Sequence, residues 1–262
     1  MKENESGAGI IPVTESKYET PENFFPVIVD NFFNEPEALV DYGKSLPKTV
    51  NRYADGQLLY PGLRSKNLWE IDEILFQTIM TKILSCYFDL GYIEISWENS
   101  NMTFQEIPQY SENKNDIKNR GWIHQDFPGN HQLAGLIYLT PNIEPDSGTS
   151  LFDLKSSTVK LESHNMKFPL WEKESPQSHI KYEENFLEKV RVQNRFNRLI
   201  MYDTREWHRA NSYYSGDGED TRLTLAFFVG GINVQPLKRI KDGKLDTTIK
   251  LQIESRLDKF QL

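Results

Sequence analysis

The chain has 262 residues, of which 38% are hydrophobic and 12% aromatic, which is enough for a large folded core and too much for a disordered chain. The formal balance of 30 basic against 38 acidic residues gives a net charge of −8, so we expect no nucleic-acid partner. The only cysteine, Cys86, excludes an intramolecular disulfide. With no apolar stretch typical of a signal peptide or a membrane span, we expect a cytoplasmic protein without a membrane partner.

The length suits one large domain over residues 1–262, because barrels and sandwiches of this size fold as one unit. Changes of composition along the chain divide that domain into a flexible tail (1–20), an N-terminal helical support (21–100), a β core (101–232) with an insertion (153–197), and a C-terminal extension (233–262).

The helical support contains three expected elements. A short strand lies within residues 24–33, and a helix opens at Pro36 and runs to Leu46. A longer helix spans about residues 71–90, where apolar residues recur at helical spacing. Cys86 falls in that helix, so we expect an inert, buried thiol there.

From residue 93 onward the pattern changes to strands. Short runs rich in β-branched and aromatic residues, separated by Gly, Pro, Asn and Asp turns, occupy 93–97, 103–107, 121–126, 133–140, 149–152, 198–202, 208–213 and 222–229. This series indicates an all-β core. The polar insertion is expected to form a surface loop or lid with a helix-like piece near 182–192, and the helical spacing of 246–262 predicts an outer helix.

The chemistry of the chain centres on His124-Gln125-Asp126 and His208. Side chains two positions apart on a strand share a face, so His124 and Asp126 can bind one ion. Two imidazoles and one carboxylate form a facial set that leaves half of an iron(II) coordination sphere open. The spacing therefore predicts a metal site, and with it the catalytic centre, at His124, Asp126 and His208.

Arg222 opens the next apolar strand after His208. The open positions of such a metal would accept a bidentate 2-oxo acid and dioxygen, and the far carboxylate of the 2-oxo acid needs a cation. The guanidinium fork of Arg222 suits a carboxylate, and Thr224 on the same face would add a hydrogen bond. Both residues are candidate co-substrate ligands.

These pieces occur in the order found in a known family. From about residue 103 to 231 the chain carries, in sequence, 124–126, 136–139, 147–152, 197–202, His208 and 221–224. In this region it resembles the iron(II)- and 2-oxoglutarate-dependent dioxygenases, and within them the prolyl-hydroxylase-like branch. The resemblance implies a double-stranded β-helix, or jelly roll, with iron(II), 2-oxoglutarate and O2 as cofactor set. It also implies that Tyr138 helps to hold the distal carboxylate of 2-oxoglutarate.

The implied activity is hydroxylation of an unactivated C–H bond in a small molecule or in a protein residue such as proline, with release of succinate and CO2. A non-catalytic jelly-roll binding module with a structural metal is one alternative, although such a site has no need of Arg222. A cupin-type metal enzyme without 2-oxoglutarate is another, although cupins draw more histidines from the first ligand strand. Substrate identity and oligomeric state are not specified by the resemblance.

Other residues have more than one interpretation. Arg64 either binds an anionic substrate group or is solvated or tied to a carboxylate, and Arg198 either lines the cavity or pairs with an acid at its rim. Trp122 is expected in the core, with a pocket wall as the alternative. We expect surface positions for three histidines, namely His131, His164 and His179. Asp203 and Glu206 either orient His208 or are ordinary turn acids, and neither is assigned to the site.

Overall fold

The computed structural model describes residues 23–50, 52, 60–91, 93–126, 131–156, 176–216 and 221–236. The expected tail over 1–20 and the outer helix over 246–262 lie outside the described residues. Within the described ranges the helices are α1 (Pro36–Ser45), α2 (Leu68–Ile71), α3 (Glu73–Leu84) and α4 (Pro176–Glu183). None of these is both long enough and apolar enough to cross a membrane.

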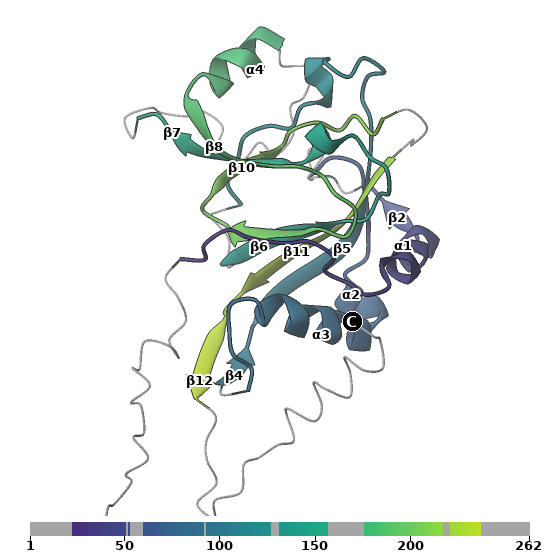
Figure 1. Ribbon diagram of the computed structural model, residues 1–262, viewed down its shortest axis with the longest axis vertical. Coiled ribbons are helices and arrows are strands. Elements are labelled where there is room, and N and C mark those ends of the chain that lie inside the picture. Colours follow the sequence, from purple (N-terminus) through teal and green to yellow (C-terminus); the bar gives the residue numbers. More distant parts are fainter. Residues whose placement is uncertain are drawn as a thin grey trace, which may run out of the picture.

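The strands of the described part are β1 (Val27–Val29), β2 (Lys48–Thr49), β3 (Leu63–Ser65), β4 (Ile93–Ser96), β5 (Asn99–Pro108), β6 (Leu133–Tyr138), β7 (Thr149–Leu154), β8 (Phe186–Val192), β9 (Leu199–Asp203), β10 (Trp207–Ala210), β11 (Thr221–Gly230) and β12 (Asn233–Pro236). A seven-stranded sheet has the order β1-β9-β6-β11-β5-β3-β2, and a three-stranded sheet has the order β10-β7-β8. The two sheets face each other, while β12 and β4 form a separate ribbon (Figure 1).

The chain moves back and forth between the two sheets. It leaves β5 in the large sheet, pairs at His124 with His208 at the edge of the small sheet, and returns to β6 in the large sheet. It then forms β7 and β8 in the small sheet, β9 in the large, β10 in the small and β11 in the large. Strands that neighbour each other thus come from distant parts of the sequence, which is the winding of a double-stranded β-helix. The predicted mainly-β jelly roll with N-terminal helices is confirmed.

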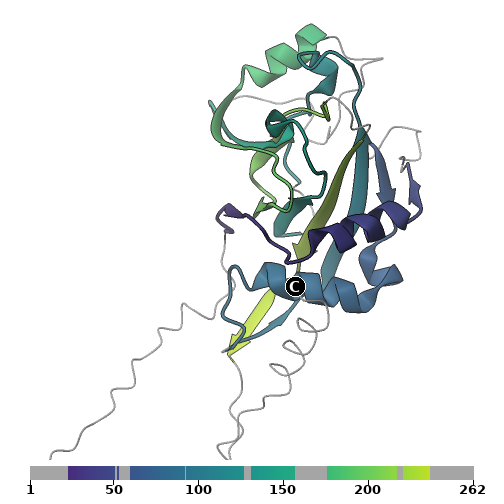
Figure 2. The same ribbon diagram turned by 45° about the vertical axis from the view of Figure 1, so that its right-hand side comes forward.

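The two faces of the large sheet have different partners. Its outer face packs against α1 and α3, which lie across it in Figure 2. On β11 the alternate residues Leu223, Leu225 and Phe227 join that apolar cluster. Because the side-chain period of a strand is two, Arg222 and Thr224 lie on the opposite face, toward the small sheet. The polar residues of this strand are therefore buried between the sheets.

Helix α3 is shorter than the predicted helix over 71–90. The Asp72 side chain caps its start by accepting from the Leu75 N–H at 2.9 Å, and the helix ends at Leu84. Beyond it, Tyr87 and Phe88 turn to contact Phe24, with ring centroids 5.1 and 6.3 Å away. Cys86 is consequently exposed, and the predicted burial of its thiol is wrong.

The predicted helix-like piece near 182–192 is also wrong. Helix α4 ends at Glu183, and residues 186–192 form β8, which pairs antiparallel with β7 along its length. Phe186 and Val192 at the ends of the strand are buried, and the charged residues between them are exposed. The insertion thus supplies a strand of the small sheet, while residues 157–175 lie outside the described ranges.

Candidate metal centre

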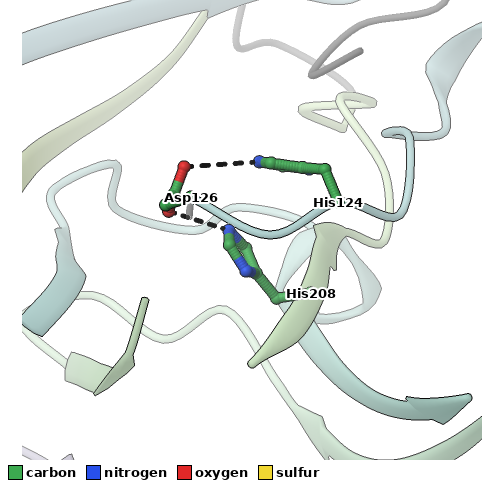
Figure 3. Close-up of side chains that lie close together, drawn as sticks. All are labelled: His124, Asp126 and His208. Carbon is green, nitrogen blue, oxygen red and sulfur yellow. Dashed lines mark ion pairs between the residues drawn. The ribbon is translucent and has the colours of Figure 1, made fainter. Parts of the chain in front are cut away.

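His124, Asp126 and His208 lie together at the edge of the small sheet. His124 and His208 exchange backbone hydrogen bonds of 3.0 and 2.9 Å, and the Asp126 N–H donates to Thr204 O at 3.0 Å. His124 Nε2 is 3.8 Å from Asp126 Oδ1, and His208 Nε2 is 3.3 Å from Asp126 Oδ2 (Figure 3). The three ligand atoms lie within 4.8 Å of one another, so they could hold one metal ion.

The other ring nitrogen of each histidine is bonded to a backbone carbonyl. His124 Nδ1 is 2.8 Å from Trp122 O, and His208 Nδ1 is 2.8 Å from Glu206 O. A carbonyl only accepts, so each Nδ1 carries the hydrogen and donates it. In the neutral ring the lone pair then lies on Nε2, the atom that faces Asp126. This is the tautomer that a metal ligand requires.

The carboxylates near His208 have other roles. Glu206 orients His208 through its backbone carbonyl, while its carboxylate binds Lys189 Nζ at 2.6 Å. The Asp203 carboxylate accepts from the Phe24 N–H at 3.1 Å and from the Arg205 guanidinium at 2.7 Å. Among the described residues, neither carboxylate forms a hydrogen bond with the His208 ring. Asp203 and Glu206 therefore do not orient His208 through their side chains.

A cavity of about 100 Å³ adjoins the three residues and lies between the two sheets. The lining residues from the large sheet include Gln105 on β5, Leu136 on β6 and Arg222 on β11. Arg222 is 2% exposed, and its Nε and Nη2 have no hydrogen-bond partner among the described residues. A buried guanidinium without a counter-charge is costly, so this arrangement fits an anionic ligand in the cavity.

Tyr138 and Thr224, the other predicted co-substrate ligands, lie next to Arg222 but behind the cavity wall. They pair with each other across β6 and β11, and neither is among the lining residues. The Tyr138 hydroxyl donates to Thr149 Oγ1 at 2.8 Å, and its ring centroid is 5.3 Å from Arg222 Cζ. Burial raises the pKa of Tyr138, and the charge of Arg222 opposes that rise.

Several cavity residues were not predicted from the sequence. Tyr202 on β9 lies with its ring 4.6 Å from the His208 ring, and burial holds the pKa of Tyr202 well above its ordinary value. Tyr213 also lines the cavity, and burial raises its pKa to about 12. Alternation marks Gln105 and Tyr202 as inner residues of their strands, but which strands enclose the cavity depends on the sheet order.

The remaining candidates are resolved by their contacts. Arg198 binds Asp30, with Nη2 2.8 Å from Oδ2, so it pairs with an acid as in one of its two interpretations. Trp122 is buried and stacks on Tyr182 and His179, with centroids 4.3 and 5.0 Å away. The expected surface position of His179 is wrong, because α4 buries it fully against Trp122. His131 is half-buried, and His164 lies outside the described residues.

Fold and site together define a jelly-roll protein with a candidate metal centre of two histidines and one aspartate. A family model described as a family of unknown function, DUF6445, matches residues 18–229, and the chain belongs to this family. No curated protein matches the chain significantly.

Several solved structures are distantly similar. A prolyl hydroxylase from Trichoplax adhaerens, in complex with a hypoxia inducible factor oxygen degradation domain peptide, is 13% identical, with 79% of this chain and 83% of that one covered and a TM-score of 0.47. HygX from Streptomyces hygroscopicus, with nickel and 2-oxoglutarate bound, is 13% identical, with 78% and 82% covered and a TM-score of 0.45. A Pseudomonas putida prolyl-4-hydroxylase is 10% identical, with 78% and 92% covered and a TM-score of 0.43.

Proposed function

We propose that the protein is an iron(II)- and 2-oxoglutarate-dependent oxygenase that hydroxylates an unactivated C–H bond of a small molecule or a peptide. One observation carries the proposal: a buried guanidinium with unpartnered nitrogens, Arg222, lines the same cavity as the three candidate ligands. A site that held a metal only for structural reasons would not need an uncompensated cation beside it.

The residues present fit the proposed cofactor set. His124, Asp126 and His208 would bind iron(II), which leaves positions open for a chelating 2-oxo acid. Arg222 would bind the far carboxylate of 2-oxoglutarate, while Tyr138 and Thr224, which lie beside Arg222 behind the cavity wall, would support its guanidinium. When bound, iron(II) and 2-oxoglutarate supply the oxidising chemistry with dioxygen, and succinate and CO2 leave as by-products.

The protein's own part in the reaction is to position the ligands and to exclude water. The backbone carbonyls of Trp122 and Glu206 hold both histidines with Nε2 toward Asp126. Ile107, Ala134 and Phe228 give the cavity an apolar wall beside its charged residues. An apolar wall of this kind limits water around the ligands and strengthens the attraction of Arg222 for a carboxylate.

The proposal is tested by anaerobic titration of the iron(II)-loaded protein with 2-oxoglutarate, followed by calorimetry and by the weak visible absorption of a 2-oxo acid chelated to iron(II). We expect binding in the wild type and no iron binding in Asp126→Ala. Arg222→Gln should bind iron normally, but its affinity for 2-oxoglutarate should be lower by at least about tenfold, which is the effect of losing one charge-assisted hydrogen bond. Tyr138→Phe should weaken the binding free energy of the co-substrate by about 1 kcal/mol, the effect of one lost hydrogen bond.

Arg195→Gln is a matched control, because Arg195 is an exposed arginine paired with Asp30 outside the cavity. It should leave both affinities unchanged. Folded, iron-loaded protein that does not bind 2-oxoglutarate would overturn the proposal in favour of a structural metal or a different metal enzyme. Unchanged 2-oxoglutarate affinity in Arg222→Gln would overturn the assignment of the anchor.

A further inference from the structure

A second arginine, Arg64, lines the cavity together with Arg222 and the three candidate ligands. It lies on β3, a short strand that pairs with β5 so that Arg64 is opposite Gln105. The large sheet thereby brings a cation from the N-terminal part of the chain to the cavity beside the candidate metal ligands.

Arg64 is held in place by two contacts. Its guanidinium carbon lies 3.6 Å from the centroid of the Tyr60 ring, and Nη2 donates to Gln105 Oε1 at 3.1 Å. The Gln105 amide is itself oriented, because its Nε2 donates to Pro61 O at 2.7 Å. At Gly62, with φ +73°, a Cβ atom would lie 2.1 Å from Glu106 O, so only glycine allows this turn to lie against β5.

Arg64 forms no ion pair with a carboxylate among the described residues. Six described arginines each form an ion pair with an aspartate or a glutamate, namely Arg120, Arg191, Arg195, Arg198, Arg205 and Arg209. Arg64 and Arg222 have no such pair in the described part of the chain, and the Nε of Arg64 has no hydrogen-bond partner there. Arg64 and Arg222 both line the cavity.

Arg64 nevertheless remains charged. Burial lowers its pKa to about 10, and the nearby Tyr60, Asp126 and Tyr213 limit that decrease. At neutral pH the guanidinium is therefore protonated. Asp126 faces it from the candidate metal centre but would be engaged by the metal in the proposed function.

A charge count then leaves Arg64 without a counter-ion. In the proposed function, the charges of iron(II), Asp126, the two carboxylates of 2-oxoglutarate and Arg222 cancel. The positive charge of Arg64 is left over in a partly enclosed cavity, where its attraction for an anion is only weakly screened.

We propose that Arg64 binds an anionic group of the substrate, so that the substrate is a carboxylate- or phosphate-bearing acid. This inference rests on the proposed function, since it assigns the other charges to iron and 2-oxoglutarate. Gln105 and Tyr60 act as positioning residues for the guanidinium, whose planar fork can donate hydrogen bonds to two oxygens of a carboxylate or a phosphate.

The test measures anion binding directly. The iron(II)-loaded protein, under anaerobic conditions and saturated with the unreactive analogue N-oxalylglycine, is titrated by calorimetry with inorganic phosphate and with acetate. We expect at least one of them to bind, and to bind at least about tenfold more weakly to Arg64→Gln. N-oxalylglycine itself should keep its affinity in Arg64→Gln, and the exposed control Arg195→Gln should bind the anions normally. Arg64→Lys, which keeps the charge but loses the fork, should bind them with intermediate affinity.

The outcomes separate this inference from the proposed function. Equal anion affinity in wild type and Arg64→Gln, or no anion binding by the analogue-loaded wild type, overturns the role of Arg64. If N-oxalylglycine does not bind, the proposed function fails, and the phosphate titration is repeated in the Arg222→Gln background without it. Phosphate binding that is then lost on Arg64→Gln supports the anion site alone. Should Arg64→Gln fail to fold, Arg64→Lys decides, because unchanged affinity in that variant overturns a bidentate contact.

Discussion

Single residues at the candidate metal centre are oriented by the backbone. His124 and His208 each donate from Nδ1 to a carbonyl two positions earlier in the chain. The same local geometry thus sets the tautomer of both rings, although one histidine precedes the jelly-roll core strands β6 to β9 and the other follows them. Because the acceptors are carbonyls, substitution of the Glu206 side chain would leave this orientation intact.

Asp203 provides a prediction about pH. Burial alone would raise the pKa of Asp203, but hydrogen bonds from Arg205 and from the Phe24 N–H outweigh it, and the pKa lies below its ordinary value of 3.8. We expect Asp203→Asn to lower the free energy of unfolding by about 1–3 kcal/mol at neutral pH. A carboxylate with a depressed pKa in the folded state stabilises above its unfolded pKa, and this stabilisation is lost as the pH falls through the folded value.

The measurement is urea unfolding of wild type and Asp203→Asn at neutral pH and at acidic pH. The difference in unfolding free energy between the two should be constant above the ordinary pKa of 3.8 and shrink as the pH falls below it. A difference that stays the same on acidification would show that the carboxylate charge is not the stabilising feature.

Among the elements, the start of β7 lies so close to the end of β8 that Gly148 has no room for a side chain. Gly148 precedes β7 with an ordinary φ of −74°, but a Cβ atom there would lie 1.8 Å from Val192 O. We expect Gly148→Ala to push the two strands apart and to lower the free energy of unfolding by about 1–3 kcal/mol, the usual cost of overpacking. Thermal and urea unfolding would measure it.

Gly91→Ala is the matched control for this glycine. A Cβ atom at Gly91 would meet only Asp89 Oδ1, at 3.2 Å, in an exposed loop. Its unfolding free energy should stay within about 0.5 kcal/mol of wild type. Equal effects of the two substitutions would mean that the approach of Gly148 to Val192 does not limit the packing of β7 on β8.

At the scale of the whole molecule, the proposed ligands connect the two sheets. The candidate metal ligands lie at the edge of the small sheet, whereas Arg222 is on β11 of the large sheet. Iron(II) and 2-oxoglutarate bound together should therefore stabilise the folded state, by about 2.7 kcal/mol at a concentration one hundred times the dissociation constant. Anaerobic scanning calorimetry should show a higher melting temperature, which a chelator reverses.

Asp126→Ala serves as the control for that stabilisation. Without its carboxylate ligand, the variant should melt at the same temperature with and without iron(II) and 2-oxoglutarate. A rise of equal size in Asp126→Ala would place the stabilising ions at another part of the surface.

Local patterns determined much of the fold. Turn residues and period-two alternation located most of the strands, and alternation also placed Arg222 and Thr224 on the inner face of β11. Residues 186–192 are an exception, because a polar insertion with charged residues predicts a helix-like piece where the structure has a strand. Those residues form a strand because β7 offers them a hydrogen-bonding edge, and that edge is not visible in the segment itself.

The sequence by itself indicated the candidate metal ligands, because His124 and Asp126 at strand spacing are a local chemical signal, to which His208 adds a second imidazole from a distant part of the chain. Only the tertiary structure decided that Arg64 shares their cavity. Arg64 reaches Gln105, a residue 41 positions away, through the pairing of β3 with β5. It also decided that His179 is buried, because α4 packs it against Trp122. Contacts of this kind depend on which strands and helices meet in space. That arrangement is stabilised by packing throughout the core and not by any one segment of the sequence.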